Sequence, residues 1–192
     1  ALACRYRVAR SDVKIGFPEV ILGLVPGAGG TQRLPRLVGM VAALRLIPTG
    51  ESVSGELARD LGLVDSLDDD PVARAMTITE HDIDRVVPVG KLALDVVDDT
   101  RFDCARDKAR RQMRGQDAPL IAIDLLQAAQ SQNLLAGLGA ERAAFLTLRQ
   151  SEQARALRHI FFAERGAKKI SADLRLQIKT LDHVAVVGGG TM

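Results

Sequence analysis

Apolar and polar residues alternate near the start of the chain, first over residues 6–9 and again over residues 13–17. Such alternation is typical of half-buried β-strands. Pro18 follows the second segment and ends regular pairing, because proline has no N–H to donate to a strand ladder. The start of the chain is therefore expected to form two short strands that lead into a turn.

Glycine and proline divide the following stretch into a loop and short helices. The run Pro-Gly-Ala-Gly-Gly at residues 26–30 predicts a loop, and Thr31 is expected to cap a helix that begins near Gln32. A second helix is expected from residue 41, with Pro48 and Gly50 as its stop. Later signals predict a third helix between Ser54 and Gly62, a short strand over residues 63–67, and a fourth helix capped by Asp69 or Asp70 with Pro71 in its first position.

Helical spacing dominates from about residue 102 to residue 167. Pro119 is well placed to start a helix that reaches Leu135, and Gly137 and Gly139 are expected to break it. Apolar side chains at three-and-four spacing then predict one buried helix face, made of Phe145, Leu148, Ala154, Leu157 and Phe161. A polar connector over residues 171–180 is expected to lead into an apolar strand over residues 183–187.

The charge balance argues against nucleic acid as a partner. The 26 basic and 24 acidic residues give a net charge of +2. Basic residues cluster over residues 106–114, but acidic residues are interleaved, which favours a solvated helix face over a phosphate-binding patch. With no Trp and few aromatic residues, the chain offers little surface for stacking bases.

The remaining composition predicts a soluble domain of the cytoplasm. No run of residues is long and apolar enough for a membrane span. Cys4 and Cys104 form no paired motif and are expected to be small buried side chains, as suits a reducing compartment. His81, His159 and His183 belong to no motif and are expected at or near the surface.

Four runs of residues carry a family resemblance. They are Ala-Leu-Ala-Cys at residues 1–4, Ile-Gly-Phe-Pro-Glu-Val at 15–20, Pro-Gly-Ala-Gly-Gly-Thr-Gln-Arg-Leu at 26–34, and Leu-Gly-Leu-Val-Asp at 61–65. Together they resemble the enoyl-CoA hydratase, or crotonase, family, and the run at 26–34 is highly specific.

Two further segments carry a second resemblance. Residues 184–192 are similar to the first strand and glycine turn of 3-hydroxyacyl-CoA dehydrogenases, although the third glycine of Gly-x-Gly-x-x-Gly would follow Met192 directly. Residues 141–165 are similar to the helical linker of multifunctional fatty-acid oxidation proteins. The chain thus resembles the seam of a bifunctional hydratase and dehydrogenase of fatty-acid β-oxidation.

The resemblance implies a helix-rich, mixed α/β fold. Residues 1–100 are expected to be the C-terminal part of a crotonase domain, a ClpP-like spiral of ββα units. Residues 101–180 would form the helical linker, and residues 181–192 the first strand and truncated glycine loop of a Rossmann domain.

The resemblance also assigns catalytic residues. Glu19 matches the family's second glutamate, which protonates the α-carbon of a 2-enoyl-CoA thioester, and Pro18 would fix the turn that aims it. Gly27 matches a glycine whose backbone N–H positions the catalytic water. Independently of the family, the N-terminus of the helix at Thr31 should favour a negative charge nearby.

The cofactor expected for the dehydrogenase part is NAD, with Gly188, Gly190 and Met192 against it, and no metal is expected. The partners implied are an acyl-CoA substrate and, for the longer protein, a second copy or an associated thiolase. Acyl chain length is left open.

The family's first glutamate would fall just before Ala1, so the chain by itself is expected to be inactive as a hydratase. An enoyl-CoA isomerase or other crotonase enzyme, and a non-catalytic hydratase-like subunit, remain alternatives.

Overall fold

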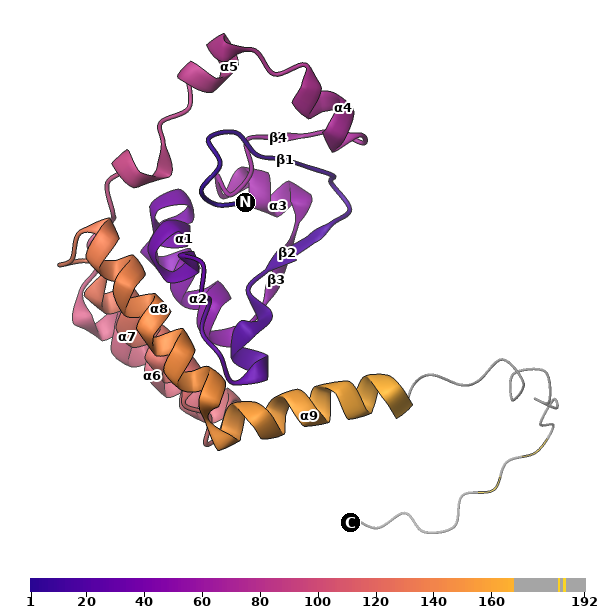
Figure 1. The fold of residues 1–192 in the computed structure, drawn as a ribbon, viewed down its shortest axis with the longest axis vertical. Helices are drawn as coiled ribbons and strands as arrows, with labels where there is room; N and C mark the ends of the chain where they lie inside the picture. Colours follow the sequence, from indigo (N-terminus) through magenta and orange to yellow (C-terminus); the bar gives the residue numbers. More distant parts are fainter. Residues whose placement is uncertain (168–182, 184, 186–192) are drawn as a thin grey trace. The chain divides into compact units, whose positions relative to one another are not determined.

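The computed structural model describes residues 1–167, 183 and 185 (Figure 1). The chain divides into two units, Ala1–Arg158 and His159–Met192. The strands are β1 (Val8–Ala9), β2 (Lys14–Gly16), β3 (Ser52–Ser54) and β4 (Ser66–Leu67). The 3-10 helices are η1 (Pro18–Leu22) and η2 (Val89–Lys91). The α-helices are α1 (Gly30–Val38), α2 (Met40–Thr49), α3 (Gly55–Asp60), α4 (Pro71–Met76), α5 (Glu80–Asp84), α6 (Asp99–Gln112), α7 (Ala118–Ala128), α8 (Leu134–Gln150) and α9 (Glu152–Ala167).

The described strands pair in two short ladders. β1 lies parallel to β4, and β2 lies antiparallel to β3 with Ile15 opposite Val53. Arg7 joins the first pair, since its guanidinium donates to both carboxylate oxygens of Asp65 at 3.0 and 3.1 Å. Both strands expected before residue 18 are therefore confirmed, although they are shorter than the alternating segments.

Several local signals are confirmed. Ser54 caps α3 by accepting a hydrogen bond from Leu57 N at 3.2 Å, and Asp70 caps α4 from the position before Pro71. Gly62 has a φ of +79°, a left-handed conformation that favours glycine after a helix. In this region, the sequence therefore predicts the capping residues at helix starts and the glycine at the helix end correctly.

The expected cap of α1 is wrong, and the expected stop of α2 is confirmed for Gly50 but not for Pro48. The residue that precedes α1 is Gly29, and Thr31 lies inside the first turn. Pro48 does not stop α2 but lies in its last turn, and the helix ends at Gly50, whose φ is +68°. A single proline near a helix end is tolerated when the left-handed glycine after it closes the turn.

The helix expected from Pro119 to Leu135 begins as predicted, with Pro119 in its first turn, but its expected end is wrong. α7 ends at Ala128, and α8 begins anew after Asn133, whose side chain accepts from Ala136 N at 2.9 Å. Gly137 does not break α8, because it lies within it and faces the Gln32 side chain. Gly139 lies within α8 as well, so neither glycine marks a boundary.

The apolar pattern from residue 145 to residue 161 spans two helices instead of one. Ser151 interrupts it with an extended ψ of 149°, and its hydroxyl accepts from Ala154 N at 3.1 Å, which starts α9. The gap between Leu148 and Ala154 does not fit three-and-four spacing, and that gap is where the helices part.

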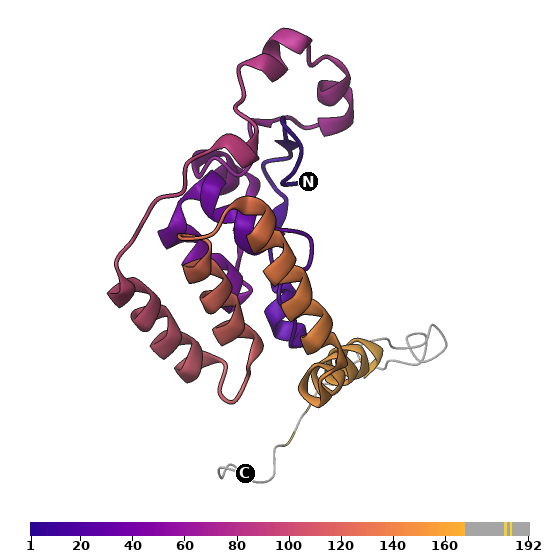
Figure 2. The same cartoon turned by 60° about the vertical axis from the view of Figure 1, so that its left-hand side comes forward.

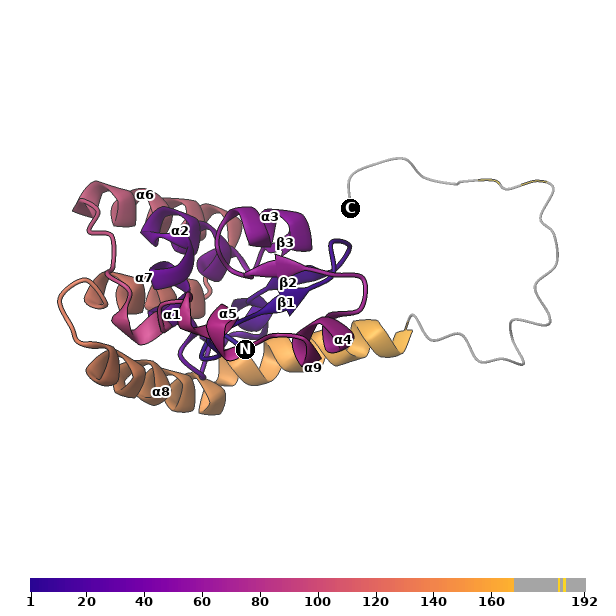
Figure 3. The same ribbon diagram turned by 90° about the horizontal axis from the view of Figure 1, so that it is seen from above.

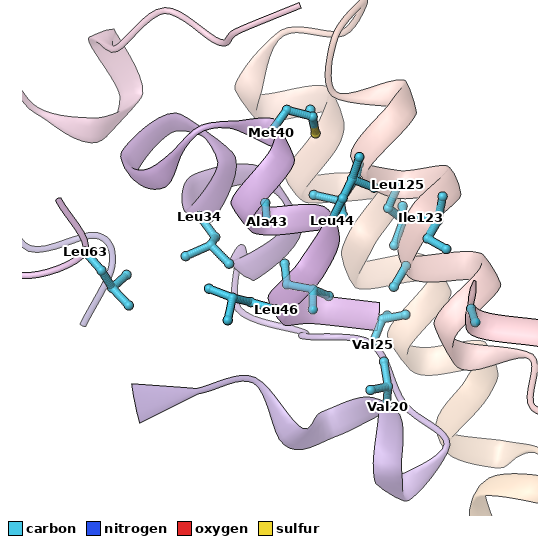
Figure 4. Packing of buried hydrophobic residues seen from close by; sticks show 14 of the residues in the cluster. Val20, Val25, Leu34, Met40, Ala43, Leu44, Leu46, Leu63, Ile123 and Leu125 are labelled. Carbon is cyan, nitrogen blue, oxygen red and sulfur yellow. The ribbon is translucent and has the colours of Figure 1, made fainter. Parts of the chain in front are cut away.

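The core of the first unit lies between helices. α1 and α2 pack against α7, and α6 and α8 pack beside α7, whereas the strands lie beyond α1 and α2 on the other side (Figure 3). Figure 4 shows the buried side chains of this cluster, which includes Leu34, Leu46 and Ile123. Helices α6, α7 and α8 therefore share one core with the motif-bearing residues 1–67.

The segment over residues 68–98 contributes little to that core. Neither α4 nor α5 has a buried residue, and both lie away from the helical core in Figures 1 and 2. Among the described residues, no helix has the length and apolar character that a membrane crossing requires.

Both cysteines contradict the expectation of burial. Cys4 lies in the irregular start of the chain and Cys104 on the outer face of α6, and both are exposed free thiols. Apolar neighbours in the sequence do not bury a side chain that the helix turns outward. All three histidines are exposed, as expected.

The second unit begins within α9. There, the Phe161 and Phe162 rings pack edge to face with their centroids 5.4 Å apart. The Arg165 guanidinium carbon lies 4.7 Å from the centroid of the Phe161 ring. The expected connector at 171–180 and most of the expected strand at 183–187 lie outside the described residues.

Candidate active site

Glu19 and Gly27 line one pocket, although seven residues separate them in the chain. The pocket has a volume of about 310 Å³ and lies within the first unit. Among its described lining residues, Glu19 alone has an ionisable side chain. The others are small or apolar and include Leu2, Ile15, Phe17 and Pro26. The structure therefore brings one carboxylate to the wall of an otherwise apolar hollow.

The backbone at Glu19 is fixed by the neighbouring residues and not by a hydrogen bond of the Glu19 side chain. Glu19 lies in η1 between Pro18, in the first position of that helix, and Val20, which is fully buried. Its backbone carbonyl accepts from Leu24 N at 3.0 Å, across the left-handed Gly23. The backbone at Glu19 is therefore fixed by burial on one side and by a hydrogen-bonded turn on the other.

The Glu19 carboxylate has an oxygen that lacks a partner. Its Oε2 is buried, and no described residue makes a hydrogen bond to it. Buried polar atoms are nearly always paired, so an unpaired one needs an explanation, such as an ordered water or a ligand. This atom is the strongest sign that the pocket binds a polar group.

Gly27 meets the face of an aromatic ring. A Cβ atom at this position would lie 2.7 Å from Cγ of Phe145, which belongs to α8. Cβ atoms do not approach other atoms this closely, so the close approach of the loop to α8 requires glycine here. Val25, just before the loop, is fully buried (Figure 4).

A second glutamate reaches the same loop from α8. Glu141 is only 1% exposed, and its carboxylate accepts hydrogen bonds from the backbone N–H groups of Gly29 and Thr31 and from the Thr31 hydroxyl. The two bonds from Thr31 are both 2.7 Å long. A carboxyl group therefore lies at the N-terminus of α1, where the sequence predicts that negative charge is favoured.

Two opposing effects act on the pKa of Glu141. Burial raises it above the ordinary glutamate value, and this effect is the largest. The hydrogen bonds from Thr31 and Gly29 and the positive charge of Arg33 lower it, because they favour the ionised form. The net direction is upward, so the folded protein holds this proton more tightly than an exposed glutamate would.

Sequence reasoning missed Glu141 as part of the site. The sequence resemblance places this residue only at the start of a linker-like helical segment. A signal was present, however, because Glu141 lies four residues before Phe145 and seven before Leu148, on the buried face of α8. A charged residue on an apolar helix face needs a buried partner, and the open N–H groups at the start of α1 supply it.

The remaining sequence-predicted site residues belong to the expected nucleotide loop. Gly188, Gly190 and Met192 lie outside the described residues. In the described part of the chain, no cluster of three or more His, Cys, Asp or Glu side chains could hold a metal ion.

Comparisons with known proteins agree with these observations. Residues 1–91 match the family described as enoyl-CoA hydratase/isomerase. A peroxisomal bifunctional enzyme from Homo sapiens is 40% identical, and the match covers 100% of this chain and 28% of the relative. A fatty acid oxidation complex subunit alpha from Vibrio cholerae is 38% identical over 100% of this chain and 29% of the relative. The chain thus spans less than a third of the length of these curated relatives.

A solved structure shows a similar fold. The crystal structure of a carnitinyl-CoA dehydratase from Mycobacterium thermoresistibile has a TM-score of 0.57 and 18% identity, and the match covers 92% of this chain and 62% of that one. At this identity the likeness concerns the fold alone. It extends well beyond residue 91, so helices outside the family match are covered by the same fold.

Proposed function

We propose that the pocket holds the reacting end of a 2-enoyl-CoA thioester for syn hydration, since residues 1–91 match the enoyl-CoA hydratase/isomerase family. The observation that carries the proposal is the buried, unpartnered Glu19 Oε2 in a pocket that Gly27 also lines. An apolar hollow with one carboxylate suits a substrate whose reacting carbons are apolar and whose product gains one water.

Each residue has a defined role in this proposal. Glu19 gives a proton to C2 of the enoyl group as the oxygen of a water molecule forms a bond to C3. The proton that this water loses passes to a second carboxylate, the family's first glutamate, which the longer protein would supply. Gly27 holds the water through its backbone N–H. The negative charge that develops on the thioester oxygen is stabilised by N–H donors, a role that this proposal gives to no residue of the pocket.

We also propose that the chain is part of a longer, bifunctional enzyme of fatty-acid oxidation. The relatives that match the whole chain are named as a bifunctional enzyme and as a subunit of a fatty acid oxidation complex. In that protein, NAD would accept a hydride from the 3-hydroxyacyl-CoA product, with Gly188, Gly190 and Met192 at the start of its site. Association with a second copy or a thiolase, and a cytoplasmic location, remain predictions of the sequence.

The test is the replacement of Glu19 in the longer protein. With crotonyl-CoA, Glu19→Gln should lower kcat by about 10²- to 10⁴-fold, the usual contribution of a positioned acid. The matched control is Glu56→Gln, which changes an exposed glutamate in α3. Unchanged hydration by the Glu19 variant would refute the assigned role. Turnover of a 3-enoyl-CoA but not of crotonyl-CoA by the unaltered protein would favour the isomerase, and turnover of neither would favour a non-catalytic subunit.

A further inference from the structure

One face of α8 supplies two different contacts to the loop that carries Gly27. Glu141 binds the end of the loop through Gly29 and Thr31, and the Phe145 ring lies against Gly27 itself. Glu141 and Phe145 are four residues apart, so one turn of the helix places both on the same face. The spacing of α8 therefore fixes two points of the loop at once.

In the described structure, the backbone N–H groups of Gly29 and Thr31 donate to no acceptor other than Glu141. The first N–H groups of any helix lack partners within that helix. At α1, the Gly29 and Thr31 N–H groups donate to Glu141, and the carboxylate is almost completely shielded from water. Without Glu141 these buried donors would have to shift toward another acceptor. Gly27 precedes Gly29 by two residues, so such a shift would move it.

From this arrangement we infer that Glu141 is a positioning residue of the proposed hydration reaction. It touches neither the pocket nor the substrate, but it holds the loop so that Gly27 stays at a set distance from Glu19. Glu141 lies outside residues 1–91, the part that matches the family. The inference rests on the proposed function, since the geometry being held is that of the proposed site.

A purely structural role makes a different prediction. If Glu141 served stability alone, its replacement would lower the fraction of folded protein but leave kcat per folded molecule unchanged. A positioning role instead lowers kcat of the folded enzyme and affects KM less, because the water and the acid lose alignment while the rest of the substrate still binds.

Three variants separate these roles. Glu141→Gln keeps the size of the side chain but turns an NH₂ group toward a backbone N–H donor. Thr31→Val removes the hydroxyl that donates to Glu141, and Thr31→Ser restores a hydroxyl at that place. Glu152→Gln is the control, because Glu152 is exposed in α9 and remote from the loop's hydrogen bonds.

The measurement is kcat and KM for crotonyl-CoA with the longer protein, corrected for the folded fraction by circular dichroism. We expect Glu141→Gln to lower kcat about 100-fold, the cost of a small misplacement of reacting groups, with KM changed far less. Thr31→Val should lower kcat less, and Thr31→Ser should recover most of the loss. Hydrogen exchange on the 192-residue chain should show faster exchange over residues 26–33 in Glu141→Gln but not in α7.

Glu19→Gln is measured in parallel, so that the two proposals fail separately. If Glu19→Gln keeps full activity, the proposed function is wrong. If Glu19→Gln is inactive while folded Glu141→Gln keeps the wild-type kcat and loop protection, the positioning role is wrong and the function stands. Equal loss in Thr31→Val and Thr31→Ser would also overturn the positioning role, because the hydroxyl would then be irrelevant.

Discussion

The loop over residues 26–31 lies between two glutamates with opposite surroundings. On the side of η1, Glu19 has a buried carboxylate oxygen without a hydrogen-bond partner in the described part of the chain. On the side of α8, both carboxylate oxygens of Glu141 accept hydrogen bonds from the loop end. The first carboxylate is left free for a ligand, whereas the second is fully used by the protein.

Under the proposed function, this difference distinguishes a residue that acts on the substrate from a residue that holds the backbone. A group that must act on a substrate has to be left unsatisfied in the empty protein, which costs stability at that position. A group that holds the backbone can be satisfied completely. The two regions are therefore expected to respond in opposite ways to the same kind of substitution.

The largest expected effect on stability is that of Glu141→Ala. It leaves two buried backbone N–H groups and one hydroxyl without their acceptor, and should lower the free energy of unfolding by about 2–4 kcal/mol. Glu19→Ala removes an unpaired oxygen and should change the free energy by less than about 0.5 kcal/mol, or raise it. Urea titration of the 192-residue chain, followed by circular dichroism, measures both.

Glu152→Ala is the control for this comparison. It removes an exposed carboxylate whose ion pair with Arg155 is within one surface turn, so it should have almost no effect. A loss for Glu19→Ala as large as that for Glu141→Ala would mean that both carboxylates support the fold, and the distinction between the two regions would fail.

A smaller effect is expected where α8 meets the loop without a charge. In Gly27→Ala the new methyl group would collide with the Phe145 ring, and the resulting shift should cost about 1–3 kcal/mol. Gly139→Ala adds the same methyl group within α8, where no atom lies within 4 Å. Removing a glycine from a helix interior should stabilise the protein by about 0.5–1 kcal/mol. The pair thus predicts opposite signs, and equal effects would show that the loop does not press against α8.

The same contrast explains what the sequence could predict. Glu19 and Gly27 lie in a motif that is read directly from neighbouring residues, and local signals such as Ser54, Asp70 and Gly62 gave the right helix ends. These features depend on residues close together in the chain. The motif and the caps were therefore readable without knowledge of the fold.

Contacts between distant segments were not readable in this way. Glu141 and Gly29 lie 112 positions apart in the chain. Gly137 is predicted to break a helix, but in the structure it allows the Gln32 side chain to pack closely against α8. The exposure of Cys104 likewise depends on which face of α6 is turned to the core. In each case the missing information is the packing of one helix on another.

The smallest expected effect concerns the ionisation of Glu141. Its pKa is raised by burial, so the folded chain keeps this proton at pH values where the unfolded chain has released it. Proton binding that favours the folded state makes stability fall as pH rises. The contribution of Glu141 is therefore greatest below the ordinary glutamate pKa and declines until the raised pKa is passed.

Glu141→Gln lacks this titration, whereas the other carboxylates titrate in both proteins and cancel in the difference. The advantage of the wild type over Glu141→Gln in the free energy of unfolding should thus shrink as the pH rises above the ordinary glutamate pKa, which urea titrations at a series of pH values would measure. An advantage that grows over this range would mean that the hydrogen bonds from Gly29 and Thr31 outweigh burial, and that the charged form is the one the loop prefers.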